Sequence, residues 1–395
     1  MYKSSNTNIY EYQKNFYPVN EIRLVHSGPD YFDALEEIIH NAKHTLHFQT
    51  YIFDGDETGL RIADALQSAA QRGVLVFVVL DAFGSKNLPK QIIDDMIDSG
   101  VKFRFFSPFF SFQNIYIGRR LHHKIIVADA KIALVGGINI ADKYKGTPLE
   151  LPWLDYAVLV KGNACEHANK ICEQICKKIF WVKIKREEKQ VLPDGNYYIG
   201  FRQNDRLRRK NQICSGYERA IRNSKKSVII VASYFLPGIK LKKALERATK
   251  NKSEITIILS GVSDIPLFRL ATSYLYSYLH KHNIKIYEWK KSVLHGKLAV
   301  VDESWTTIGS FNLNHLSSHG SIETNVEVLG KQFASGVKKH LSEIILNGCV
   351  KIEKKSASNL KGRFLGAVAY FFVRTTINFI ALLPNIKYFY TRIND

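Results

Sequence analysis

The sequence predicts an α/β protein of two similar halves, each a mixed, largely parallel sheet flanked by helices, that share one active site at their interface. The first observation behind this prediction is a repeated motif, His-x-Lys-x4-Asp, which occurs as His122/Lys124/Asp129 and as His295/Lys297/Asp302. Each copy is followed by an asparagine, Asn139 or Asn312, seventeen residues after its histidine. The second observation is that an Asn-x-Lys sequence before an apolar strand also recurs, at 41–43 and 223–225. A repeat on this scale indicates a duplicated structural unit.

Helices and strands alternate in the same order in both halves. Apolar strands are predicted at 44–53 and 226–235, each preceded by an amphipathic helix. A second helix follows at 61–73 and 240–250, and a second strand at 74–81 and 254–260. A further helix and strand lead to the motif strands, and this alternation favours a sheet covered by helices.

The polar stretch at 187–196 predicts the joint between the halves. We therefore expect a first half at 1–190, a second half at 191–350, and a C-terminal segment at 351–395 that is basic and apolar.

The motifs lie in apolar, β-branched runs, HHKIIVAD and HGKLAVVD, which predict buried strands. Side chains alternate along a strand, so each histidine shares a face with the lysine two residues later. Asp129 and Asp302 fall on the opposite face and are expected to support the local structure. Asp155 and Glu327 follow His122 and His295 by thirty-three and thirty-two residues, so we expect them to bind the far imidazole nitrogen and stabilise the charged ring.

These residue types suit cleavage of a phosphodiester without metal. One imidazole can attack phosphorus while the other protonates the leaving oxygen and later deprotonates the incoming hydroxyl. The two lysines would hold the nonbridging oxygens as compact charges, and Asn139 and Asn312 would donate neutral hydrogen bonds to them. The sequence therefore predicts an enzyme with no cofactor and no metal.

With GGIN at 136–139 and GSFN at 309–312, the paired motifs resemble those of the phospholipase D superfamily. The resemblance implies a phosphohistidine intermediate and two pseudo-twofold related domains with one active site between them. It also suggests His122 as the nucleophile and His295 as the acid. Gly137 stands where the second copy has Ser310, so the first half lacks a hydroxyl that would support the site.

Within that superfamily, the segment from Ala34 to Asp81 and GGINIADKY at 136–144 look like the bacterial cardiolipin synthases. This implies that the enzyme joins two phosphatidylglycerols and releases glycerol, with phosphatidylglycerol and cardiolipin as its lipid partners. A hydrolytic phospholipase that produces phosphatidic acid, a phosphatidylserine synthase and a metal-independent nuclease stay open. A membrane-binding scaffold without catalysis is a further alternative, which would tolerate loss of His122.

Charge and the C-terminal segment favour a lipid surface. The formal net charge of +20, from 56 Lys and Arg against 36 Asp and Glu, predicts attraction to an anionic bilayer or to nucleic acid. The run at 364–392 is apolar and aromatic but contains Arg374, which costs roughly 2.5–3.5 kcal/mol at the centre of a bilayer. We therefore expect a helix or hairpin lying on the membrane, which makes nucleic acid an unlikely partner; the alternative is a helix packed on the second half.

The N-terminus lacks a signal-peptide pattern, so we expect a peripheral or monotopic protein on the cytoplasmic face of the bacterial inner membrane, with no obligate protein partner. Five cysteines suit a reducing cytosol. Cys165, Cys172 and Cys176 have helical spacing, which favours a packed stripe over a zinc site. Aromatic residues after the paired early strands, among them Tyr51, Phe53, Tyr234 and Phe235, either line the substrate entrance or belong to the core. The aromatic run at 103–112 either dips into the membrane or packs on the neighbouring half.

Overall fold

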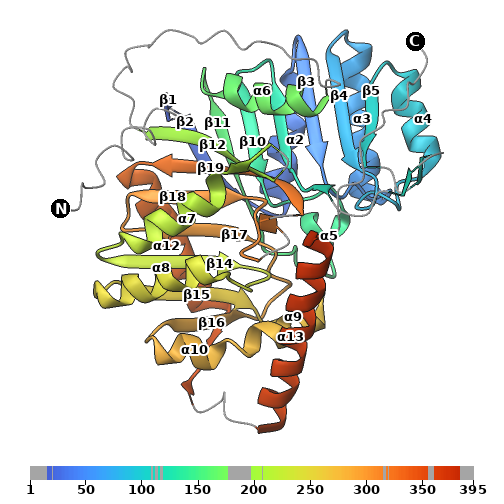
Figure 1. The fold of residues 1–395 in the computed structure, drawn as a ribbon. Coiled ribbons are helices and arrows are strands. Elements are labelled where there is room, and N and C mark those ends of the chain that lie inside the picture. The colour runs from blue at the N-terminus through green and yellow to red at the C-terminus, as the bar shows by residue number, and fades with distance from the viewer. Residues whose placement is uncertain are drawn as a thin grey trace.

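The computed structural model shows two similar halves, the first blue to green and the second yellow to orange in Figure 1. It describes residues 16–19, 21–107, 110–111, 114–115, 119–176, 197–206, 208–314, 317–318, 320–354 and 360–382. The proposed joint at 187–196 lies outside the described residues, as does part of the aromatic run at 103–112.

The first half forms a seven-stranded sheet in the order β2-β11-β10-β9-β3-β4-β5. Its elements are β2 (Glu21–His26), α2 (Pro29–Asn41), β3 (Thr45–Thr50), α3 (Glu57–Gln71), β4 (Leu75–Asp81), α4 (Lys90–Asp98), β5 (Lys102–Phe106), β6 (Phe110–Ser111), β7 (Asn114–Ile115), β8 (Arg120–Leu121), β9 (Ile125–Ala128), β10 (Ile132–Gly136), α5 (Asp142–Lys145), β11 (Tyr156–Lys161) and α6 (Cys165–Cys176).

The second half repeats this order as β12-β19-β18-β17-β14-β15-β16. Its elements are β12 (Tyr197–Asp205), β13 (Lys210–Asn211), α7 (Gln212–Arg222), β14 (Ser227–Ala232), α8 (Ile239–Lys250), β15 (Glu254–Ser260), α9 (Pro266–Ser273), α10 (Tyr276–Lys281), β16 (Lys285–Trp289), β17 (Lys297–Val301), β18 (Trp305–Gly309), β19 (Ser321–Leu329), α12 (Lys331–Gly348), β20 (Cys349–Lys351) and α13 (Leu360–Leu382). The predicted duplication of helices and strands is confirmed.

Each sheet is mixed, as predicted, but the expectation that it is largely parallel is wrong. In the first sheet the parallel pairs are β3–β4 and β4–β5. In the second they are β14–β15 and β15–β16, besides the short parallel pair of β8 with β19 between the halves. Parallel neighbours need a long crossover, and helices supply it here. The motif strand β9 turns directly into β10 at Asp129–Lys131, so these strands are antiparallel.

Three large apolar clusters among the described residues hold the layers together, beside a small one around Leu121 and Ile322. One lies under the helices of the first half and one under the helices of the second. The third lies between the halves, where Ile125 and Val135 of the first sheet pack with Leu298 and Val326 of the second. Cys165 and Cys172 of α6 join this shared cluster, which accounts for their stripe. The two sheets therefore bury a common core.

The N-terminal strand crosses between the halves. β1 (Tyr17–Val19) pairs with β12, at the edge of the second sheet, although it precedes the whole first half in the chain. The main chain of the first half thus contributes to the sheet of the second.

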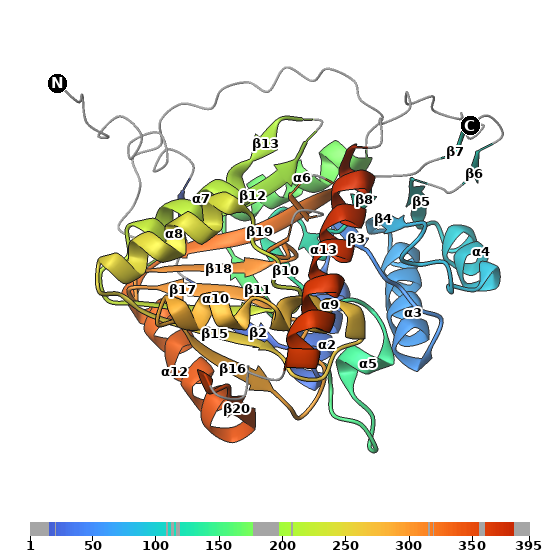
Figure 2. The same ribbon diagram turned by 60° about the horizontal axis from the view of Figure 1, so that its bottom comes forward.

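Helix α13 lies along the second half beside α9 (Figure 2). Ala369, Tyr370, Val373 and Ile377 pack into the cluster of that half. The opposite face leaves large apolar side chains exposed: Phe364, Leu365, Val368, Phe371 and Phe372. Of the helices in the described part of the chain, none is long and apolar enough to cross a bilayer.

Candidate active site

Two sets of backbone hydrogen bonds join the halves, one beside each motif histidine. The carbonyl of Leu154 accepts hydrogen bonds from the backbone N–H groups of His295 (2.8 Å) and Gly296 (2.9 Å). In the equivalent place, the backbone N–H of His122 donates to the carbonyl of Ile322 at 3.0 Å. The residue that follows Leu154 or Ile322 therefore lies beside the histidine of the other half.

Those following residues are carboxylates. Asp155 Oδ2 lies 2.6 Å from His295 Nδ1, and Glu323 Oε2 lies 2.8 Å from His122 Nδ1. Each imidazole of one half is thus held by an acid of the other. This leaves Nε2 of both rings available to a substrate.

The expected pairings were wrong in both halves. Asp155 binds His295 and not His122, while Glu327 binds Arg202, whose Nε lies 2.8 Å from its Oε2 in a buried ion pair. Equal spacing in the two halves does not lead to Glu323, which follows His295 by only twenty-eight residues.

The spacings in fact differ. Eighteen residues separate Gly137 from Asp155, but thirteen separate Ser310 from Glu323, because the connection of the first half is five residues longer. The signal that could have identified Glu323 is its place directly after a buried apolar residue at the start of the strand, as Asp155 follows Leu154.

Lys124 and Lys297 are both buried, at 2% exposure each. Lys124 Nζ donates to the carbonyl of His122 at 3.1 Å, and Lys297 Nζ lies 2.9 Å from His295 Nδ1. Burial lowers the pKa of Lys124 to about 7; Glu323 opposes that shift and Lys297 adds to it. Burial also lowers the pKa of Lys297, against the attraction of Asp155. These charges act on one another across the interface, so the twin motifs form one site.

The surroundings of both imidazole rings favour the neutral form. Burial lowers the pKa of His122, and Glu323 opposes this. For His295 burial again lowers the pKa, and Lys297 and Lys124 lower it further. Burial raises the pKa of Asp155 to about 6. Asp155 therefore takes up a proton more readily than an exposed aspartate does, while His295 gives one up more readily than an exposed histidine does.

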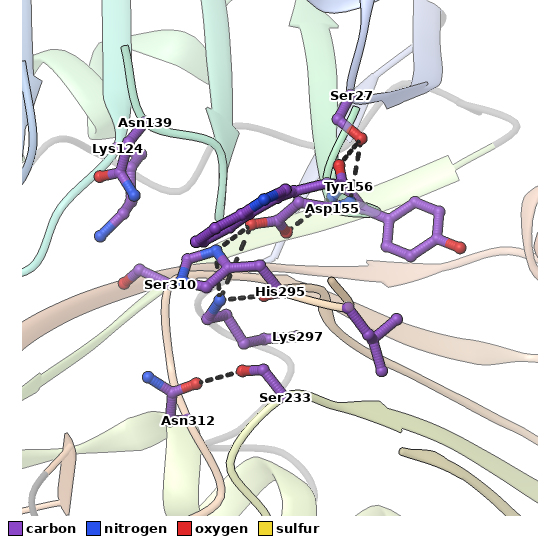
Figure 3. A network of polar contacts seen from close by, with 12 residues as sticks. Ser27, Lys124, Asn139, Asp155, Tyr156, Ser233, His295, Lys297, Ser310 and Asn312 are labelled. Carbon is purple, nitrogen blue, oxygen red and sulfur yellow. Dashed lines mark hydrogen bonds and ion pairs between the residues drawn. The ribbon is translucent and has the colours of Figure 1, made fainter. Parts of the chain in front are cut away.

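The two asparagines are oriented through their amide oxygens. Asn139 Oδ1 accepts from the backbone N–H of Ile52 at 3.1 Å, and Asn312 Oδ1 accepts from the Ser233 hydroxyl at 2.9 Å. Figure 3 shows Asn139 and Lys124 on one side and His295, Lys297, Ser310 and Asn312 facing them. Anchoring the oxygen leaves the amide N–H groups as donors to a ligand, although Asn139 uses one on the Tyr144 hydroxyl.

Ser310 and Gly137 differ for a steric reason. The Ser310 hydroxyl donates to Glu323 at 2.5 Å. A Cβ at Gly137 would lie 2.3 Å from Asp155 Oδ1, so no side chain fits there. Asp155 is held instead by the backbone N–H of Tyr156, which donates to Oδ1 at 2.7 Å.

Asp129 and Asp302 lie in the turns after the motif strands. Asp129 accepts hydrogen bonds from the backbone N–H groups of 43–45, and Asp302 from those of 225–227. Both have positive φ, 51° and 52°. They tie the motif turn to the start of the neighbouring strand, on the opposite face from the histidines, as strand alternation indicated.

Aromatic rings surround the histidines unequally. Tyr51 lies 5.0 Å from the His122 ring. Tyr144, Trp153 and Tyr234 lie 5.4, 6.1 and 6.3 Å from the His295 ring. Tyr51 and Tyr234 were among the expected entrance residues, whereas Phe53 and Phe235 are fully buried in the core. The sequence offered no reason to select Tyr144 or Trp153.

Comparison with known proteins gives consistent matches. A family model described as "Cardiolipin synthase, PLD-like domain" matches residues 35–171 and 217–345. Cardiolipin synthase B of Escherichia coli (strain K12) is 30% identical over 345 residues, which cover 85% of this chain and 83% of that protein. A cardiolipin synthase of Clostridium perfringens (strain SM101 / Type A) is 28% identical over 351 residues, covering 85% of this chain and 72% of that protein.

Among solved structures, phosphatidylserine synthase of Haemophilus influenzae Rd KW20 has the same fold. It superposes with a TM-score of 0.74 at 14% sequence identity, covering 96% of this chain and 100% of that chain. At this identity the likeness concerns the fold alone.

Proposed function

The chain belongs to the phospholipase D superfamily, within its cardiolipin synthase family of phosphatidyltransferases, and from that premise we propose that it joins two phosphatidylglycerols and releases glycerol. The observation that carries the proposal is the exchange of carboxylates between the halves. It leaves two imidazole Nε2 atoms, two lysines and two asparagines for one phosphate.

In the first step, His122 Nε2 attacks phosphorus of the donor lipid. Its Nδ1 donates to Glu323, so the lone pair of the neutral ring is on Nε2. As the N–P bond forms, the P–O bond to glycerol breaks, and His295 Nε2 gives its proton to that oxygen. The product is a phosphatidyl group on His122.

In the second step, His295 takes the proton from a hydroxyl of another phosphatidylglycerol. The oxygen attacks phosphorus and the N–P bond breaks, which restores His122. Lys124, Lys297 and the amide groups of Asn139 and Asn312 stabilise the nonbridging oxygens in both steps. Ser310 holds Glu323 in place.

A bilayer location favours transfer over hydrolysis, because the acceptor lipid is concentrated there and water is restricted. The exposed apolar face of α13 and the net charge of +20 support attachment to an anionic membrane. We place the enzyme at the cytoplasmic face of the bacterial inner membrane as part of this proposal.

The test is incubation of purified protein with phosphatidylglycerol vesicles, without added metal. Free glycerol and a four-tailed lipid are expected. Phosphatidic acid as the main product would make the protein a hydrolase, and inertness toward lipid with cleavage of DNA would make it a nuclease.

The choice of nucleophile is tested by trapping. In His295→Asn, the first step lacks its acid and is slow. The phosphatidyl group that reaches His122 cannot be transferred further, because the base of the second step is also missing. Label from a radioactive phosphatidyl group should therefore stay on His122. Label retained on His295 in His122→Asn would reverse the assignment. If the protein were a non-catalytic scaffold, the wild type would show no turnover. Both variants would then bind vesicles as well as the wild type does.

A further inference from the structure

A cavity of about 680 Å³ lies in the second half under α13. It is bounded by the turn between β12 and β13, by α7, by the start of α8 and by the segment after β18. Neither motif histidine nor motif lysine lines it. Its volume falls within the roughly 300–1,000 Å³ usual for organic ligands.

The lining is apolar inside and cationic outside. Leu236, Leu241, Phe311 and Leu313 are buried apolar residues, and Ile377 of α13 closes one side. The charged residues of the lining are Arg206, Arg209, Lys210, Lys240, Arg374 and one carboxylate, Glu218. Five cations against one carboxylate favour an anionic group.

The ring of Tyr217 belongs to the apolar wall of the cavity, where it packs against Trp305 and Phe311. Tyr217 lines the cavity and is 2% exposed. Its hydroxyl oxygen has no hydrogen-bond partner among the described residues. This oxygen is also shielded from the cavity, so a ligand would contact the ring of Tyr217 and not its hydroxyl.

We propose that this cavity binds an anionic phospholipid, with one acyl chain against the apolar lining and the phosphate at the Arg209–Lys240 rim. The lipid reaches it from the membrane. Ile239, which is 64% exposed, lies at the rim, and α13 carries the exposed apolar face beside it. Each CH₂ of an acyl chain that leaves water adds to the binding free energy, so a long chain binds firmly in such a space.

The cavity is linked to the phosphoryl-transfer site through one segment. Phe311, Leu313 and Asn314 line the cavity, and Asn312 between them faces the site. The backbone N–H of Leu236 donates to the carbonyl of Leu313 at 3.0 Å, which ties both walls together. A bound lipid therefore steadies the loop that positions Asn312. The binding itself does not depend on the proposed reaction.

The test uses full-length protein and lysophosphatidylglycerol with a diazirine in its acyl chain, below its micellar concentration. After illumination, labelled peptides are mapped by mass spectrometry. Label is expected on 236–241, 311–314 or 370–377, also in His122→Asn, which separates binding from turnover. The same probe with a choline headgroup should label these segments at least about ten-fold less, a ratio that corresponds to 1.4 kcal/mol.

Gly238 offers a way to block the cavity. It lines the cavity, a Cβ there meets nothing within 4 Å, and its φ of −69° suits any residue. Gly238→Phe should reduce labelling about ten-fold or more, while Gly238→Ala retains it. Gly336→Phe is the matched control, because Gly336 on α12 also has nothing within 4 Å but lies outside the cavity.

The charged rim is tested with Arg209→Ala combined with Lys240→Ala, which should weaken labelling and its dependence on salt. Label confined to peptides near Tyr51 and Trp153, equal labelling by the choline probe, or unchanged labelling of Gly238→Phe would each overturn the proposal.

Discussion

At the scale of single residues, the acid beside each imidazole determines how that ring carries a proton. Glu323 holds Nδ1 of His122, and Asp155 holds Nδ1 of His295. Glu327, four residues after Glu323 on the same face of β19, neutralises Arg202 instead. Two acids of one strand thus have separate tasks, one in the site and one in the core.

Removal of each acid should have a different effect. Glu323→Gln is expected to lower kcat by roughly 10²–10⁴-fold with little change in stability, because the amide cannot stabilise an imidazolium. Glu327→Gln should instead lower the free energy of unfolding by roughly 3–5 kcal/mol, since it removes the charge that pairs with buried Arg202. Urea denaturation measures the free energy of unfolding, and initial rates measure kcat. A larger loss of kcat in Glu327→Gln would contradict the corrected pairing.

Lys124 should limit activity at alkaline pH. Burial lowers its pKa to about 7, so in the free enzyme its positive charge is present below that pH and lost above it. We expect kcat/KM to fall as pH rises through about 7. In the pH profile of kcat the same fall should occur at a higher pH, because the bound phosphate stabilises the ammonium group of Lys124.

The control for this pH profile is Lys124→Arg. A guanidinium stays charged over the whole range, so the variant should be slower but should lose the alkaline limb in kcat/KM. If kcat/KM falls over the same alkaline range in Lys124→Arg and in the wild type, the fall is due to another group.

At the scale of elements, α13 packs on the second half, which is one of the two alternatives that the sequence presented, and its outer face stays apolar. One face packs on the second half, and the other exposes Phe371 and Phe372 at 58% and 60%. A helix whose outer face is apolar and is bordered by polar residues suits the surface of a bilayer.

Phe371→Ser combined with Phe372→Ser should weaken binding to anionic vesicles by about ten-fold or more, since full burial of each ring contributes roughly 1.5–3 kcal/mol. Activity on lipid in detergent micelles should stay within about two-fold. Leu346→Ser is the control, because Leu346 is 83% exposed but belongs to α12. Sedimentation with vesicles measures the binding, and equal loss in the control would exclude a specific role for α13.

At the scale of the whole molecule, the pseudo-twofold arrangement makes each half incomplete. Leu154 and Ile322 pair with the segments before the histidines of the opposite half, and the shared apolar cluster holds this register. The symmetry is imperfect: Gly137 replaces a serine, three aromatic rings surround His295, and α13 accompanies only the second half. Such differences suit two histidines with unequal tasks.

If the site is formed within one chain, His122→Ala and His295→Ala should stay inactive when mixed. Each variant still lacks one imidazole, and the shared core prevents exchange of halves between chains. The measurement is transfer activity of the mixture after prolonged incubation. Recovery of a quarter or more of wild-type activity would show that two chains contribute to one site.

The sequence by itself determined the duplicated α/β fold, the two His-Lys pairs and the supporting role of Asp129 and Asp302. These follow from local patterns: alternation of apolar residues, helical periodicity and motif spacing. Only the tertiary structure decided that Asp155 serves His295, that Glu323 and not Glu327 serves His122, and that most strand pairs are antiparallel. These depend on the register between segments far apart in the chain, which burial across the interface sets and no local pattern encodes.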